Sequence, residues 1–105
     1  MPDVSAILSL PYIQPNQAQK HDTHNEGIRM LDALVQPAVL ETTLNTPPAG
    51  PVSGDRYIVA AGALADWAGH ENALAVWDEN YWRFYAAQTG WMVWDQAAGN
   101  HRLFD

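Results

Sequence analysis

The proline and aromatic residues of this chain occupy opposite halves of the sequence, and this separation constrains the fold more than any other feature. All seven prolines lie at or before Pro51, whereas ten of the eleven aromatic residues lie at or after Tyr57. Proline fixes φ and removes a backbone donor, while aromatic side chains are typical of strands. We therefore expect an α+β chain with its antiparallel, Trp-rich β-domain confined to residues 56–105.

The first half is predicted to contain three consecutive segments: an extended arm (residues 1–22), a helix (23–36) and a proline-rich connector (37–55). Thr23 and Glu26 fit the capping-box pattern, and apolar side chains follow at helical spacing. Pro37 ends the helix because proline cannot continue one. An earlier start near residue 16 is an alternative, and it would make the Thr23 cap wrong.

The second half is predicted to be a small antiparallel β-domain, and the 105 residues are expected to form one domain overall. Asp78–Asn80 is expected to be a tight hairpin loop between two strands. Both faces of the strand Tyr81–Tyr85 carry aromatic side chains, which is typical of a sheet buried on both sides. Val39–Leu44 is a candidate first strand. Ala75–Asp78 is echoed by Met92–Asp95, and two hairpins of one design would explain the echo.

Charge and composition exclude several partners. The chain has 12 acidic against 5 basic residues and a formal charge of −7. It therefore lacks the clustered Lys and Arg that nucleic acids and anionic membranes require. The absence of cysteine excludes disulfides, thiolate metal sites and cysteine nucleophiles. No run approaches the roughly 20 apolar residues of a membrane span. We expect neither nucleic acid nor membrane as a partner.

No residue pattern points to catalysis or to a cofactor. His21 and His24 are spaced to share a helix face, but a third well-placed metal ligand is missing. The sequence contains neither a serine elbow nor a phosphate-binding glycine loop. The acidic residues of the second half fall in predicted loops, where they are expected in any case. We therefore expect a protein that is not an enzyme and that binds no metal or cofactor.

Tryptophan is the remaining chemical signal, with five residues in the chain. Its rings stack on sugars and anchor protein interfaces, because they bury a large area at a low entropic cost. Three interpretations stay open: a domain core, a subunit interface and a platform for sugar rings. The candidates for an aromatic interface or a sugar platform are Trp67, Trp82 and Trp91.

Five segments carry a resemblance that covers nearly the whole chain: Leu10–His21, Asn25–Glu26, Leu31–Val35, Pro47–Val59 and Trp67–Gly69. Together with the Trp-rich hairpins, they resemble an uncharacterised domain family of alphaproteobacterial prophages and gene transfer agents. Members of that family lie near tail-fibre and host-recognition genes. In gene transfer agents, a protein like this belongs to the head spike, in which a base on the capsid carries a fibre that meets host polysaccharide. The family offers no catalytic residue to carry over.

The resemblance implies a non-enzymatic virion component, expected to be the head spike base that anchors the fibre. Its implied partners are capsid protein, fibre protein and further copies of the chain in a pentamer or trimer. Its implied location is the extracellular particle, after cytoplasmic assembly and release by lysis. The candidate contacts to capsid or a neighbouring subunit are Leu10, Tyr12, Ile13, Ile28, Leu31 and Leu34. The alternatives are a carbohydrate-binding module that contacts host capsular polysaccharide directly and a tail-fibre-associated adaptor.

Overall fold

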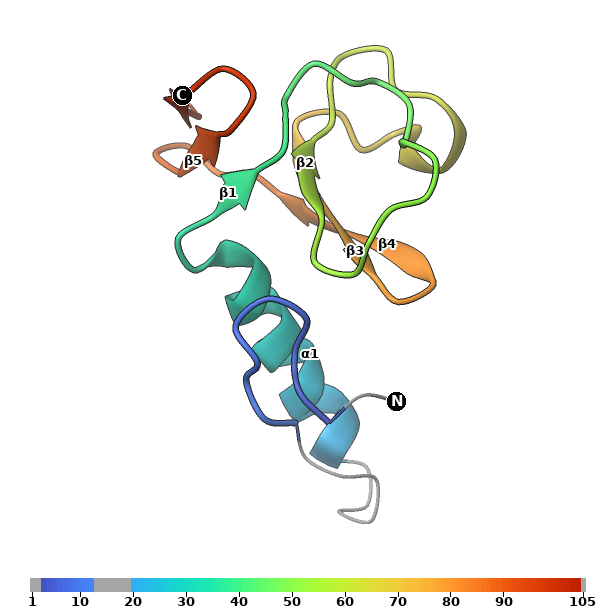
Figure 1. Ribbon diagram of the computed structural model, residues 1–105, viewed down its shortest axis with the longest axis vertical. Helices are drawn as coiled ribbons and strands as arrows, with labels where there is room; N and C mark the ends of the chain where they lie inside the picture. Colours follow the sequence, from blue (N-terminus) through green and yellow to red (C-terminus); the bar gives the residue numbers. More distant parts are fainter. Residues whose placement is uncertain (1–2, 13–19, 105) are drawn as a thin grey trace. The chain divides into compact units, whose positions relative to one another are not determined.

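The computed structural model describes residues 3–12 and 20–104. Contacts within the chain group these residues into two compact units, one up to Val35 and one from Gln36 onward, where the composition predicts a single domain. The architecture is α+β, as expected. The N-terminal unit holds the helix α1, and the C-terminal unit holds two three-stranded sheets (Figure 1). In the described part of the chain, no helix is long and apolar enough to cross a membrane.

The helix α1 (Lys20–Leu34) begins earlier than the capping pattern predicts. Thr23 lies inside the helix, so its assignment as the cap is wrong, and the alternative of an earlier start is correct in direction. Residues 16–19 lie outside the described residues. At its other end the helix stops before the predicted residue 36, because Gln36 has a left-handed φ of 45°. The following Pro37 also disfavours a helical conformation at Gln36.

The described part of the N-terminal arm, residues 3–12, is a closed loop and not an extended segment. An isolated antiparallel bridge joins Val4 to Pro11. Within it, the Ser5 amide donates to the Leu10 carbonyl oxygen at 2.9 Å. The chain can reverse between these residues because Ser9 takes a φ of 57°. The prediction of an extended arm is therefore wrong for this segment, since the chain turns back between Val4 and Pro11.

The first sheet of the C-terminal unit has the antiparallel order β2-β3-β4. Its strands are β2 (Arg56–Ile58), β3 (Ala73–Asp78) and β4 (Tyr81–Ala86). Two residues, 79 and 80, join β3 to β4, which confirms the predicted tight hairpin. Residues 73–76 of β3 are all buried, so both faces of this strand are covered, as the aromatic pattern of its neighbour indicates.

The second sheet has the order β1-β5-β6, and its strands are β1 (Ala38–Val39), β5 (Met92–Asp95) and β6 (Asn100–Leu103). Strands β5 and β6 form an antiparallel hairpin, whereas β1 pairs with β5 in parallel. The second predicted hairpin is therefore present, but the domain is not wholly antiparallel. Only Val39 of the predicted strand Val39–Leu44 lies in a strand. The chain beyond it is irregular and still bonds to β2, with the Leu40 amide 2.8 Å from the Arg56 carbonyl oxygen.

An aromatic cluster forms the core of the C-terminal unit. Its buried members are Tyr57, Val59, Ala63, Trp67, Ala75 and Trp82, with Leu40, Leu44, Trp77 and Phe84 packed around them. Trp67 comes from a short 3-10 turn (Ala65–Trp67) between β2 and β3. The Trp82 ring meets three other rings at centroid distances of 5.2 to 6.0 Å. All three of these contacts are edge-to-face, which is a favoured packing of aromatic pairs.

Candidate functional site

The three tryptophans predicted as an aromatic interface or a sugar platform do not form one surface. Trp67 is completely buried, and Trp82 is 9% exposed. Their ring centroids are 5.3 Å apart inside the core. Trp91 is half-buried just before β5, where its carbonyl oxygen accepts a hydrogen bond from the Phe104 amide. A platform for ligands is therefore wrong for Trp67 and Trp82, whose rings present no face to solvent.

One tyrosine of the aromatic core, Tyr57, has a raised pKa. Tyr57 packs against the Trp67 ring at a centroid distance of 5.7 Å. Burial raises the pKa of Tyr57 above its ordinary value, and the negative charges of Asp55 and Glu41 raise this pKa further. Both causes disfavour the phenolate, because each makes a negative charge on the ring oxygen costlier.

The six candidate contacts of the N-terminal unit differ widely in exposure. Leu31 is 55% exposed, whereas Leu10, Ile28 and Leu34 are half-buried. Ile13 lies outside the described residues. Tyr12 is buried, and the Arg29 guanidinium lies over its ring at 4.7 Å from the centroid. Tyr12 therefore fastens the loop to α1 within the unit. Of the five that the structure describes, Leu31 offers the most exposed apolar side chain.

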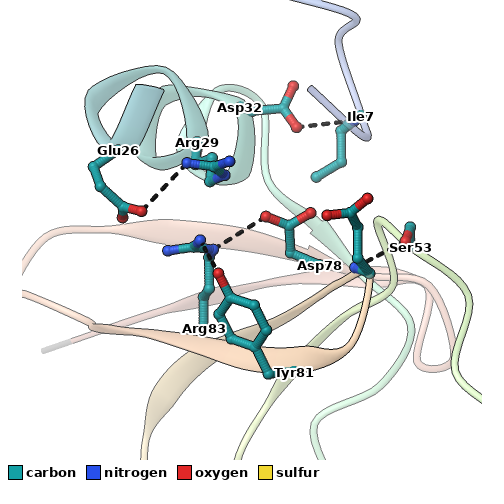
Figure 2. A network of polar contacts seen from close by, with 9 residues as sticks. Ile7, Glu26, Arg29, Asp32, Ser53, Asp78, Tyr81 and Arg83 are labelled. Atoms are coloured by element: carbon teal, nitrogen blue, oxygen red, sulfur yellow. Dashed lines mark hydrogen bonds and ion pairs between the residues drawn. The ribbon is translucent and has the colours of Figure 1, made fainter. Parts of the chain in front are cut away.

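Asp32 of α1 organises the loop of the N-terminal unit. Its carboxylate is buried and accepts three hydrogen bonds, from the Ser5 hydroxyl at 2.7 Å, the Ile7 amide at 2.9 Å and the Leu8 amide at 2.5 Å. Figure 2 shows Asp32 reaching from the helix to the backbone of Ile7. Hydrogen bonds to a charged acceptor are stronger than neutral ones. A single side chain thus fixes the conformation of residues 5–8.

The hairpin of β3 and β4 carries a second polar network. The Arg83 guanidinium contacts the Asp78 carboxylate at 3.1 Å and also bonds to the Tyr81 hydroxyl (Figure 2). At the turn, the Glu79 amide donates to the Ser53 hydroxyl at 3.0 Å. These contacts fix the hairpin tip. The Arg83 and Asp78 side chains are each 14% exposed, so this ion pair is partly shielded from water.

A pocket on the second sheet was not predicted from the sequence. It has a volume of about 430 Å³ and is lined by Gln36, Pro37, Ala38, Met92, Trp94 and His101. The rings of Trp94 and His101 lie edge-to-face, with centroids 4.9 Å apart. Trp94 is 40% exposed and Met92 53%. One signal in the sequence points to this site, because alternation along Met92–Asp95 places Met92 and Trp94 on the same face.

No metal centre is visible in the described residues: nowhere in them do three His, Cys, Asp or Glu side chains gather around a common point. His24 of the predicted pair is exposed on α1. The arrangement as a whole offers surfaces for binding, namely an apolar helix face and an aromatic pocket.

Comparison with known proteins gives one match. The model of a family described as "Protein of unknown function (DUF2793)" matches residues 24–105. No curated protein matches the chain. No solved structure matches it either. The family match spans most of α1 and the whole described C-terminal unit, including both tryptophan hairpins. The chain therefore belongs to the DUF2793 family.

Proposed function

We propose that this protein is a non-enzymatic structural component of a phage-like particle of the gene transfer agent type. In this proposal it is the base of a head spike and joins the capsid to a fibre. The support from the sequence is the resemblance of the arm, the helix and the Trp-rich hairpins to that family. The support from the structure is the apolar surface of the N-terminal unit, which is organised for a partner.

The N-terminal unit buries little apolar surface of its own. Among its described residues, Tyr12 and Ala33 are the buried apolar side chains. Its exposed large apolar side chains are more numerous: Val4, Leu8, Met30, Leu31 and Val35. A unit below about 40 residues generally needs a disulfide, a metal or a partner for stability, and this chain has no cysteine. A partner surface would supply such stabilisation, and this observation carries the proposal.

The loop of residues 5–8, which Asp32 holds in place, favours contact with a partner. Asp32 holds the backbone of Ile7 and Leu8 before any partner arrives. A preorganised loop loses less conformational entropy on binding than a flexible one. In a closed ring, the exposed face of α1 would meet either the next copy of the chain or the capsid. The C-terminal unit would then carry the fibre.

The first test is mass spectrometry of density-purified extracellular particles, with the copy number measured against the major capsid protein. We expect the chain at a low and constant ratio, because a spike base occupies a few symmetric positions. Absence from intact particles, together with abundance in the cell extract, would overturn the proposal. A ratio that varies between preparations would also contradict it, since it would indicate passive trapping.

A matched pair of variants tests which surface carries the contact. Leu31→Glu places a charge on the exposed apolar face of α1, whereas Thr23→Glu places the same charge at an exposed polar position. We expect Leu31→Glu to be missing from particles and Thr23→Glu to be incorporated normally. Circular dichroism of both isolated variants should match the unmodified chain, because both positions are exposed. Equal incorporation of the two variants would refute a role for this face.

A further inference from the structure

Trp94 differs from the core tryptophans in its surroundings. Trp67 and Trp82 are buried, whereas Trp94 leaves 40% of its surface to solvent. Its neighbours on the same face of the sheet are exposed as well, with Met92 53% and Leu103 59% exposed. A soluble protein rarely gathers large apolar side chains on one face without a binding role.

The pocket around Trp94 is built on a fixed backbone. Ala38 of β1 pairs with Trp94 of β5, and the Trp94 amide donates to the Pro37 carbonyl oxygen at 2.9 Å. On the other side, His101 of β6 is the antiparallel partner of Trp94. The lining side chains therefore come from all three strands of one sheet and the residues that precede it. Sites on regular strands hold their side chains more precisely than sites on loops.

We propose that this pocket binds the apolar face of a neutral sugar ring, a hexopyranose within a glycan. The indole of Trp94 supplies a flat apolar surface, of the kind that packs against the C–H groups of a pyranose. The His101 imidazole and the Gln36 carboxamide supply donors and acceptors for ring hydroxyls. The volume of about 430 Å³ lies within the range of about 300–1,000 Å³ that is typical of small-ligand sites.

Charge decides between classes of ligand. The lining contains no Lys, Arg, Asp or Glu, so neither an anionic nor a cationic group finds a partner of opposite charge there. The chain as a whole carries −7, which further disfavours phosphorylated or carboxylated sugars. A proline-rich peptide would need an aromatic-lined groove long enough for several residues. Trp94 is the lone indole or phenyl ring in this lining, which favours a single sugar ring.

The site goes beyond the role in a particle and does not rest on it. The experiment is a titration of the full, isotope-labelled chain with neutral oligosaccharides of glucose, galactose and mannose, followed by the indole N–H signals in NMR spectra. We expect shifts at Trp94 and along β5 and β6 with at least one of these oligosaccharides at millimolar concentration. Trp94→Ala should weaken this binding about tenfold or more, because stacking on the ring is lost.

Matched controls separate binding from folding. Trp91→Ala removes a half-buried indole outside the pocket and should leave the affinity unchanged, as should Leu64→Ala on the 3-10 turn side. Gln36→Ala should weaken binding by less than Trp94→Ala does. The proposal is overturned if no oligosaccharide of the panel shifts Trp94, if Trp91→Ala weakens binding equally, or if a proline-rich peptide shifts Trp94 and the sugars do not. Particles carrying Trp94→Ala should still contain the chain at the normal ratio, so failure of this site is distinguishable from failure of the proposed function.

Discussion

The two hairpins of the C-terminal unit start from nearly the same residues and use them differently. Ala75–Asp78 of β3 and Met92–Asp95 of β5 both end in Val-Trp-Asp. In β3 the tryptophan, Trp77, packs against the core ring of Trp82 at a centroid distance of 5.2 Å. In β5 the tryptophan, Trp94, lies on the open face of its sheet beside His101. The local sequence therefore determines that both segments form strands. Which face of each strand is covered depends on the rest of the sheet.

The aspartates that end these two strands differ as well. Asp95 is buried and accepts hydrogen bonds from the Ala97 and Ala98 amides at 3.0 and 3.1 Å and from the Thr42 hydroxyl at 3.0 Å. Asp78 instead pairs with Arg83 across its own hairpin. The same residue thus caps a four-residue turn in one hairpin and forms an ion pair in the other. The two strands end in the same residues but lead into turns of different length. The role of the aspartate carboxylate therefore follows the turn and not the strand sequence.

The largest expected effect concerns the tryptophans. Trp82→Ala should destabilise the C-terminal unit by about 3–5 kcal/mol, because it leaves a cavity among three other rings. Trp94→Ala should cost no more than about 1 kcal/mol, because its ring is already partly in water. Urea unfolding followed by tryptophan fluorescence measures both values, since all five tryptophans lie in this unit. Equal losses of unfolding free energy in the two variants would show that Trp94 is a core residue, and they would contradict the difference between the two hairpins.

The strands and one hairpin turn could be predicted from the sequence because their causes are local. The alternation in Tyr81–Tyr85 and the short loop before it indicate a hairpin, and the structure contains one. Its strand β3 is buried on both faces over residues 73–76, whereas Trp82 is the buried residue of β4. The start of α1 could not be predicted from Thr23, since a capping pattern can also occur inside a helix. The closed arm depends on Asp32, which lies 25 residues after Ile7, and no local pattern reveals that bond.

The candidate site was predicted less well than the fold. The tryptophan count pointed to Trp67 and Trp82 for a surface role, whereas the structure buries both and leaves Trp94 40% exposed. Their burial depends on how the 3-10 turn before β3 folds over the sheet, which a strand pattern does not contain. The parallel pairing of β1 with β5 joins residues more than 50 positions apart, and it alone brings Pro37 and Ala38 to the pocket.

The aspartates give the second test of the comparison. Asp95→Ala should destabilise the unit by about 1–3 kcal/mol, because two turn amides and a hydroxyl lose their charged acceptor. Asp78→Ala should cost less, about 1 kcal/mol, because the Arg83 guanidinium keeps its bond to the Tyr81 hydroxyl when it loses this carboxylate. Urea unfolding of both variants at neutral pH shows which of them loses more unfolding free energy. A larger loss for Asp78→Ala would show that the hairpin ion pair, and not the turn cap, is the stronger element.

The turns themselves give the smallest expected effect. Glu79 in the two-residue turn and Gly99 in the longer turn both have a left-handed φ, of 63° and 72°. This conformation costs a non-glycine residue roughly 1–2 kcal/mol, while glycine loses roughly 0.5–1 kcal/mol of chain entropy. Glu79→Gly should therefore stabilise the unit by up to about 1 kcal/mol, and the bond from the backbone amide of residue 79 to Ser53 would be retained. Gly99→Ala should destabilise it by a similar amount, although its new methyl group would meet no atom within 4 Å. Thermal unfolding of the two variants should shift in opposite directions. A loss of stability in Glu79→Gly would mean that the glutamate side chain supports the β3–β4 turn, and the two turns would then differ in chemistry as well as in length.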